Sequence, residues 1–288
     1  AHSYVENGTY TVTLTVTDND GLIASTNATK TVLDRPPVAS FTSSPSNPYT
    51  SDTVTFNASS SYDPDGSIAS YFWTFGDGAN GTGVVVAHSY VENGTYTVTL
   101  TVTDDDGSVG STSASKSILD RLPVASFTSS PSTPYTGDVV TFNASESYDP
   151  DGTIAWYYWT FGDGTNGTGV VTTHSYVDNG TYAVTLIVID NDGSTASTTA
   201  SKTILNKPPV ASFTSSPSTP YTGDVVTFDA SSSYDPDGTI VGYLWNFGDG
   251  TNTTGVVASH AYAENGNYTV TLTVTDNDGS TSSTSATK

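Results

Sequence analysis

The sequence contains no cysteine and no methionine, and only seven of its 288 residues are lysine or arginine. The lack of cysteine excludes disulfide bonds and zinc–thiolate sites. The start at Ala1, without a Met or a signal peptide, indicates an internal piece of a longer precursor. No apolar run approaches the roughly 20 residues that a membrane helix requires, so we expect no membrane segment in this window.

Basic residues are so scarce that the formal net charge is −22. A surface of this sign disfavours nucleic acid as a partner, because phosphate binding favours a basic face, and we expect none. Adaptation to salt would spread acidic residues over the whole surface. Many of the Asp residues instead fall in a few turn motifs, which favours cations bound at fixed places.

A strict internal repeat organises the chain. His-x-Tyr begins at His2, His88, His174 and His260, so the motif recurs every 86 residues without insertion. Phe-Gly-Asp-Gly, beginning at Phe75, keeps the same spacing. Self-similarity at a fixed period is typical of repeat architectures. The chain therefore divides into the last third of one unit, residues 1–30, followed by full units at 31–116, 117–202 and 203–288.

The pattern within each unit predicts an all-β fold with antiparallel sheets. Residues 96–103 alternate Thr with apolar side chains, which is typical of a strand with one buried and one solvated face. Val139 to Phe142 and Ile154 to Phe161 are further expected strands, separated by Pro- and Gly-rich turns. No stretch shows a helical period. An 86-residue unit has the length of a small sandwich of about seven short strands.

These units resemble the PKD domain family, an immunoglobulin-like β-sandwich, over the whole chain. The resemblance is carried by Trp73-Thr74-Phe75-Gly76-Asp77-Gly78, by His88-x-Tyr90, and by the strand that starts at Gly94. The fold that it implies is a tandem array of immunoglobulin-like antiparallel sandwiches. It also implies kinship with surface-layer and cell-surface proteins and with accessory modules of secreted hydrolases, but family membership alone does not fix a function.

The conspicuous aromatic residues have structural interpretations. Trp73, Trp159 and Trp245 are expected to fill the core between two sheets rather than to stack on a ligand. His88 and its equivalents occur once per unit without a partner pattern, which favours a packed, hydrogen-bonded histidine over a catalytic one.

A cation site is predicted from paired carboxylates. Each full unit has Asp-Pro-Asp-Gly, as at 63–66, and a later Asp-x-Asp-Gly, as at 104–107. Calcium takes six to eight oxygen ligands, and two Asp at i and i+2 around a turn can converge on one point. The alternative is that Asp and Gly simply form good turns. The second Asp of the later motif, such as Asp106, is not counted as a ligand.

The family resemblance completes the expected ligand set. It implies that calcium-binding PKD domains use this loop, the Asp at the end of the later strand, and an Asn or Asp at the domain entrance. The expected ligands here are Asp34, Asp63, Asp65 and Asp104 in the first full unit, Asp120, Asp149, Asp151 and Asp190 in the second, and Asn206, Asp235, Asp237 and Asp276 in the third.

Sequons for N-glycosylation are frequent. A chain rich in Ser and Thr forms Asn-x-Ser/Thr triplets by chance, but several of these fall at turns, where a glycan would project outward. The candidates are Asn7, Asn27, Asn57, Asn80, Asn93, Asn143, Asn166, Asn179, Asn252 and Asn267.

These observations predict a non-catalytic, extracellular or cell-surface structural protein: a rod, filament, surface layer or stalk, stiffened by calcium and glycosylated. Short junctions stiffened by Pro, such as 30–37, support this, and we expect partners to be further copies or other surface proteins and glycans. The alternative is an adhesive module or a spacer that binds polysaccharide or protein, favoured by the aromatic run 156–159. No set of catalytic roles can be assembled from the residues.

Overall fold

Every regular element of the chain is a β-strand. The computed structural model describes all of residues 1–288 and contains 23 strands and no helix. No helix long and apolar enough to cross a membrane is therefore present. Two compact units, Ala1–Leu122 and Pro123–Lys288, are described separately below. The segments 31–116, 117–202 and 203–288 are called the first, second and third repeat, and a strand that crosses one of these bounds is assigned to the repeat in which it begins.

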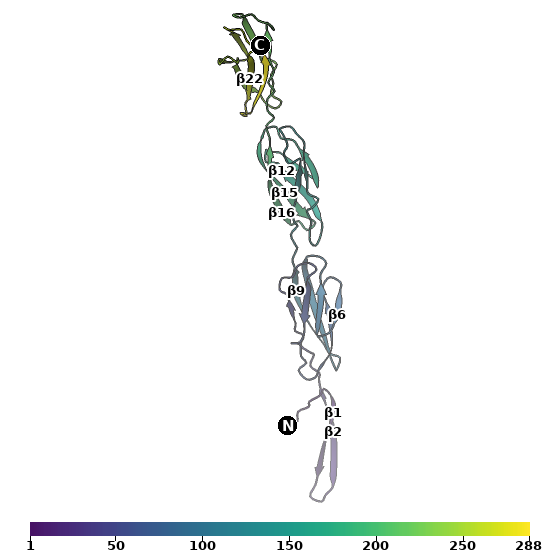
Figure 1. The fold of residues 1–288 in the computed structure, drawn as a ribbon. Coiled ribbons are helices and arrows are strands. Elements are labelled where there is room, and N and C mark those ends of the chain that lie inside the picture. The colour runs from purple at the N-terminus through teal and green to yellow at the C-terminus, as the bar shows by residue number, and fades with distance from the viewer. The chain divides into compact units, whose positions relative to one another are not determined.

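Each repeat has seven strands in two antiparallel sheets, one of three strands and one of four (Figure 1). In the first repeat the smaller sheet has the order β3-β4-β7, and the larger one has the order β6-β5-β8-β9. The strands are β3 (Thr42–Ser44), β4 (Thr53–Asn57), β5 (Ile68–Thr74), β6 (Asn80–Thr82), β7 (Val85–Ser89), β8 (Gly94–Asp104) and β9 (Val109–Ile118).

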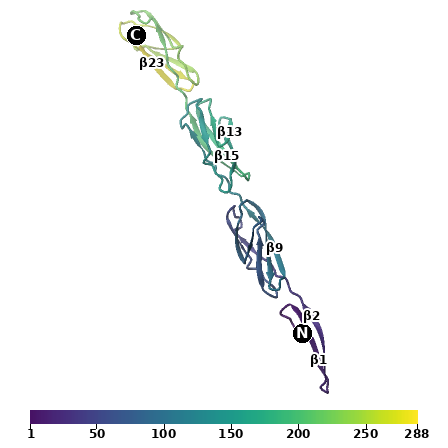
Figure 2. The same cartoon turned by 90° about the vertical axis from the view of Figure 1, so that its right-hand side faces the viewer.

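The second and third repeats reproduce this topology, with sheets β10-β11-β14 and β13-β12-β15-β16, then β17-β18-β21 and β20-β19-β22-β23 (Figure 2). The strands of the second repeat are β10 (Thr128–Ser130), β11 (Val140–Asn143), β12 (Ile154–Thr160), β13 (Asn166–Thr168), β14 (Val171–His174), β15 (Gly180–Asp190) and β16 (Thr195–Ile204). Those of the third are β17 (Thr214–Ser216), β18 (Val225–Asp229), β19 (Ile240–Asn246), β20 (Asn252–Thr254), β21 (Val257–Ala261), β22 (Thr269–Asp276) and β23 (Thr281–Thr287).

The alternating sequence of β8 explains why this strand lies at the centre of the sandwich. Val98, Leu100 and Val102 are fully buried, while the intervening Thr side chains point away from the core. Successive side chains of a strand face opposite sides of the sheet, so the apolar set covers the core and the Thr set faces solvent. The expected all-β, immunoglobulin-like sandwich is thus confirmed, and the expected strand ends are met to within two residues.

A buried tryptophan occupies the core of each repeat. Trp73 has no exposed surface, and its ring packs against Phe41 and Phe56 with centroid distances of 5.1 and 5.8 Å. Its indole Nε1–H donates to the carbonyl of Gly83 at 2.9 Å, so its polar atom is satisfied. Trp159 and Trp245 have the same burial and the equivalent bond. The predicted core role of these residues is confirmed.

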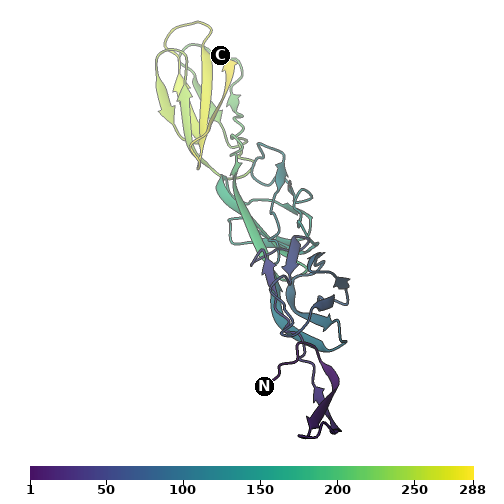
Figure 3. The same ribbon diagram turned by 90° about the horizontal axis from the view of Figure 1, so that it is seen from below.

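The N-terminal hairpin consists of β1 (Gly8–Thr17) and β2 (Ile23–Val32) and carries no second sheet (Figure 3). Val12, Leu14 and Val16 are 48%, 60% and 54% exposed. Their counterparts 86 residues later are the buried Val98, Leu100 and Val102. The hairpin therefore shows the strand pairing of a repeat without its core.

Candidate metal centre

Strand pairing brings the two acidic motifs of a repeat together. The Asp-Pro-Asp-Gly loop precedes β5, and the Asp-x-Asp-Gly turn follows β8. β5 and β8 are antiparallel with Ile68 opposite Asp104, so the loop and the turn lie beside each other. β12 with β15 and β19 with β22 have the same register. Sequence positions about 40 residues apart thereby form one acidic end in each repeat.

The turn after β8 fixes one carboxylate oxygen of Asp104. Its Oδ1 accepts the backbone amides of Asp106 and Ser108 at 3.1 and 2.7 Å, while Gly107 adopts a φ of 88°. A Gly takes this left-handed conformation without steric cost. Asp104 is 2% exposed, and its Oδ2 is buried without a hydrogen-bond partner. Asp190 and Asp276 share this arrangement on Oδ1.

The middle residue of the Asp-x-Asp-Gly motif joins the two loops, a role that sequence reasoning missed. Asp105 accepts the amide of Ser67 on its side chain at 2.8 Å and donates its own amide to the Ser67 carbonyl at 3.0 Å. Asn191 and Asn277 make the same pair of bonds to Thr153 and Thr239. The available signal was that every copy of the motif has Asp or Asn at this position.

The glycine of the Asp-Pro-Asp-Gly loop lies tightly against the side chains of both acidic loops. A Cβ at Gly66 would lie 2.7 Å from the carboxylate oxygens of both Asp63 and Asp105. At Gly238 the corresponding distances are 2.2 Å to Asn277 and 2.7 Å to Asp235. Contacts this short force the neighbours to move. Glycine thus allows the two loops to close around their side chains.

The carboxylates of this end repel one another. Burial raises the pKa of the Asp63 carboxyl, and although a bond from the Asp65 amide opposes this, three nearby carboxylates raise it further. Burial and neighbouring carboxylates likewise raise the pKa of Asp149 and of Asp235. Like charges brought together disfavour the ionised form. The pKa values are therefore raised first by burial and then by the negative charge of neighbouring carboxylates.

Several carboxylate oxygens here are buried without a partner. In the first repeat they are Oδ2 of Asp34, Oδ1 of Asp65 and Oδ2 of Asp104. In the third they are both oxygens of Asp235 and Oδ1 of Asp237. Unpaired buried charge is costly, and each such atom in a native protein calls for an explanation. The second repeat has the same feature at Oδ2 of Asp149 and of Asp190.

In the third repeat the entrance residue is Asn206 rather than Asp. Its amide Nδ2 donates to Oδ2 of Asp276 at 2.8 Å and to Oγ of Ser280 at 3.0 Å. The backbone amide of the following Lys207 donates to Oδ2 of Asp237 at 2.9 Å. The entrance segment thus contacts both acidic loops.

The same segment is anchored on its other side to the second repeat. Leu205 donates its amide to the carbonyl of Pro134 and accepts the amide of Thr136, both at 2.9 Å. The Lys207 ammonium donates to the Thr136 carbonyl at 2.7 Å and lies 3.7 Å from a carboxylate oxygen of Asp138. Three consecutive residues therefore hold parts of two repeats.

The side chains of the acidic end have the chemistry that calcium binding requires, but they are not yet close enough together to coordinate an ion. All the side chains are carboxylates or amides, the hard oxygen donors that calcium takes. As they stand, no group of three or more His, Cys, Asp or Glu is arranged to hold a metal ion. Asp34, Asp63, Asp65 and Asp104 gather at one end of the first repeat, and Asn206, Asp235, Asp237 and Asp276 at that of the third. Asp149, Asp151 and Asp190 gather in the second, whereas Asp120 belongs to the first compact unit.

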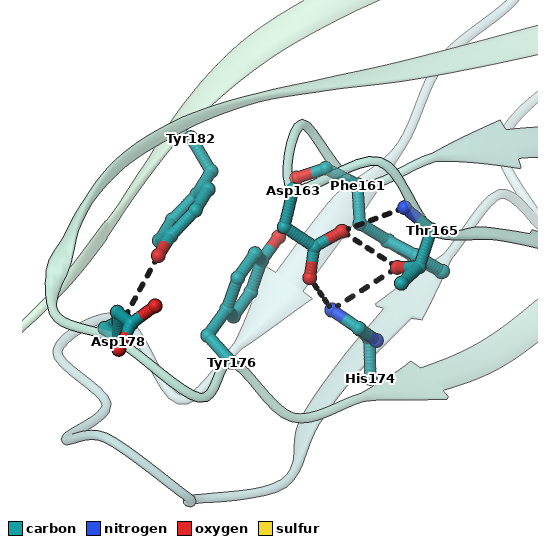
Figure 4. Close-up of polar contacts among 7 residues, drawn as sticks. All are labelled: Phe161, Asp163, Thr165, His174, Tyr176, Asp178 and Tyr182. Atoms are coloured by element: carbon teal, nitrogen blue, oxygen red, sulfur yellow. Dashed lines mark hydrogen bonds and ion pairs between the residues drawn. The ribbon is translucent and has the colours of Figure 1, made fainter.

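A second polar cluster surrounds the histidine of each repeat, and Figure 4 shows that of the second repeat. His174 Nε2 lies 2.6 Å from Oδ2 of Asp163, and the imidazole stacks on Phe161 at a centroid distance of 4.3 Å. Tyr176 donates its hydroxyl to the Phe161 carbonyl at 3.0 Å. His88 and His260 pair with Asp77 and Asp249 at the same distance. The histidine is therefore packed and hydrogen-bonded, as predicted.

The geometry of this cluster does not match a nucleophile–base–acid relay. In such a relay the acid and the nucleophile occupy different nitrogens of the imidazole. Here Asp163 and the Thr165 hydroxyl, 3.4 Å away, both face Nε2 of His174. The first repeat has Ala79 at the position of Thr165. The arrangement is that of a hydrogen-bonded clasp between the two sheets.

None of the ten candidate glycosylation asparagines is buried. Exposed positions are Asn27, Asn80, Asn166, Asn252 and Asn267, and the others are partly exposed. Asn57 and Asn143 accept the backbone amide two residues later at 2.9 Å, so their side chains also support a turn.

The chain belongs to the PKD domain family. The sequence profile of the PKD domain matches residues 34–118, 120–204 and 206–288, which together cover most of the chain. The sequence match and the sandwich fold therefore agree on this family.

Several known proteins are similar to the chain. The mouse Dyslexia-associated protein KIAA0319-like protein is 29% identical over 94% of this chain and 29% of its own length. The Pre-pro-metalloprotease PrtV of Vibrio cholerae is 37% identical over 48% of the chain and 15% of its own length. The crystal structure of the PKD1 domain of Vibrio anguillarum Epp is 38% identical, covers 29% of the chain and 94% of that domain, and has a TM-score of 0.26. The chain thus spans less than a third of the length of the KIAA0319-like protein and of PrtV.

Proposed function

We propose that the chain is a non-catalytic extracellular spacer whose PKD repeats are stiffened by calcium. The observation that carries the proposal is the acidic end of each repeat, where buried carboxylate oxygens have no partner. A divalent cation would satisfy these oxygens and offset the neighbouring negative charge that, after burial, raises the pKa of Asp63, Asp149 and Asp235. The expected ligands are the carboxylates and entrance residues named above.

The entrance segment gives this cation a mechanical role. Asn206 contacts Asp276, while Leu205 is hydrogen-bonded to the second repeat. For Asn206 to bind a cation, its amide would turn so that Oδ1 replaces Nδ2 at the site. A cation held there would fix the segment that connects two repeats. This supports a role in a filament, surface layer or stalk, in which the number and stiffness of repeats set the reach.

We also propose that the chain is glycosylated and that it contacts other molecules at the cell surface. The exposed sequons would carry N-glycans in a glycosylating host. Partners would be further copies of the chain or other surface proteins and glycans, because similar surfaces recur from repeat to repeat.

The decisive experiment is thermal unfolding of the whole chain in calcium, in magnesium and in EGTA. We expect calcium to raise the melting temperature and magnesium, which demands tighter octahedral geometry, to raise it less. Asp65→Asn with Asp151→Asn and Asp237→Asn should abolish the calcium effect, while Glu264→Gln, an exposed carboxylate outside the acidic ends, should keep it. A wild-type chain that unfolds identically in calcium and EGTA would refute the proposal.

A further inference from the structure

The outward side of the larger sheet in the second repeat carries an apolar patch. Trp156 and Tyr158 on β12 are 69% and 39% exposed. They lie opposite Ile189 and Ile187 on β15, whose side chains alternate with the buried Leu186 and Val188. Four large apolar side chains thus adjoin on one side of the sheet, which we call the aromatic face.

This patch exists in only one of the three repeats. Trp156, Ile187 and Ile189 correspond to Ser70, Thr101 and Thr103 in the first repeat and to Gly242, Thr273 and Thr275 in the third. The remaining position, Tyr158, is Phe72 in the first repeat and Leu244 in the third. The fold therefore forms without the patch, and stability of the sandwich does not account for it.

The aromatic residues of the core are separate from the aromatic face. Trp159 is fully buried, and Tyr157 packs against the core from the inward side of β12. Their counterparts Trp73 and Tyr71, and Trp245 and Tyr243, do the same in the other repeats. An exposed Trp beside two Ile is a feature of binding surfaces, because it leaves apolar area in water that a ligand would cover.

The surroundings of the patch are polar and uncharged. Asn166 and Thr168 on β13 lie on one side, and Thr195, Ser197 and Thr199 on β16 lie on the other, all exposed. No ionisable group occurs among these outward residues of a chain whose net charge is −22. An acidic polymer would be repelled by the chain, and a basic segment would find no carboxylate on this face.

We propose that the aromatic face binds an uncharged polysaccharide, with Trp156 as the main contact. The flat indole and phenol rings offer apolar area to the C–H faces of sugar rings. The hydroxyl and amide groups on β13 and β16 offer hydrogen bonds to sugar hydroxyls. The charge of the ligand follows from the neutrality of the face. The inference is independent of calcium binding.

The test is affinity electrophoresis of the whole chain, produced in a host that does not N-glycosylate because Asn166 borders the face. Native gels would contain hydroxyethylcellulose, and pull-downs would use insoluble chitin and mannan. We expect retention by at least one of these polymers, with an affinity that falls about 30-fold in Trp156→Ser. Tyr148→Ser removes a Tyr of 58% exposure outside the aromatic face and should change nothing.

A gain-of-function variant tests whether the same residues confer binding when they are placed on another repeat. Ser70→Trp with Thr101→Ile and Thr103→Ile, on the Trp156→Ser background, should restore retention from the first repeat. Failure of the wild type to bind any of the three polymers, or equal retention of Trp156→Ser, would overturn the proposal. So would self-association in sedimentation velocity that depends on Trp156 without any retention, since the occupant would then be a second copy.

Discussion

Oδ2 of Asp249 lies 2.6 Å from Nε2 of His260, and the imidazole stacks on Phe247 at 4.3 Å. Side-chain and backbone hydrogen bonds from Thr251, together with the partnership with His260, outweigh burial and lower the pKa of Asp249 to about 2. The clasp joins β21 of the smaller sheet to the turn between β19 and β20 of the larger one. The two sheets are thus joined by this polar contact as well as by the apolar core.

Acid stability should depend on these Asp residues. Because the pKa of Asp249 is lower in the folded than in the unfolded chain, its carboxylate stabilises the folded state. This stabilisation is complete above the unfolded pKa of about 3.9 and is lost as the pH falls towards the folded pKa of about 2. The pKa values of Asp77 and Asp163 are lowered too, because hydrogen bonds and the charged histidine outweigh burial. Asp77→Asn, Asp163→Asn and Asp249→Asn together should flatten the loss of stability between pH 4 and 2, measured by urea unfolding. An unchanged pH profile would contradict this role.

Filling the space at Gly238 should prevent calcium stabilisation. Gly238→Ala places a Cβ 2.2 Å from the Asn277 side-chain oxygen, so the Asn277 and Asp235 side chains must shift out of their present positions, at a cost of about 1–3 kcal/mol. Gly266→Ala is the matched control, because its Cβ would be in ordinary contact with Tyr268 at 3.5 Å. Calorimetry in calcium and EGTA should show a smaller calcium effect on the third repeat in the first variant alone.

Asn206→Asp should have opposite effects with and without calcium. Without calcium it removes the amide that donates to Asp276 and adds a charge beside that carboxylate, so stability should fall by about 1–3 kcal/mol. With calcium the added carboxylate should strengthen binding. Isothermal titration and thermal unfolding would measure both. A variant weakened equally in both conditions would show that Asn206 is only a structural residue.

Two neighbouring tryptophans should respond very differently to truncation. Trp159→Ala should cost about 3–5 kcal/mol, because it leaves a cavity and an unpaired Gly169 carbonyl. Trp156→Ala, at 69% exposure, should change the free energy of unfolding by less than about 0.5 kcal/mol. Urea unfolding followed by circular dichroism would compare them, and similar losses would show that Trp156 belongs to the fold.

Local patterns were enough to predict the strands, because alternation in residues 96–103 and the turns around them act over a few residues. The position of Trp159 in the core followed from the usual burial of tryptophan between packed sheets. The partner of each histidine could not be read, because Asp163 looked like an ordinary turn residue until two sheets placed it beside His174. Asp105 was missed for a similar reason, since its bonds reach Ser67 in another loop. The calcium ligands and the exact repeat boundaries stay predictions.

Leu205 and Asn206 are adjacent in sequence, and each is hydrogen-bonded to a different repeat, so no free residue lies between the two contacts. The carbonyl of Leu205 accepts from Thr136, and the very next side chain donates to Asp276. Tension passing along the backbone would therefore load hydrogen bonds in both repeats before any residue between them could extend. Lengthening the chain at this point requires rupture of one of those bonds, so resistance to force begins at the connection and not only in the sandwich that follows it.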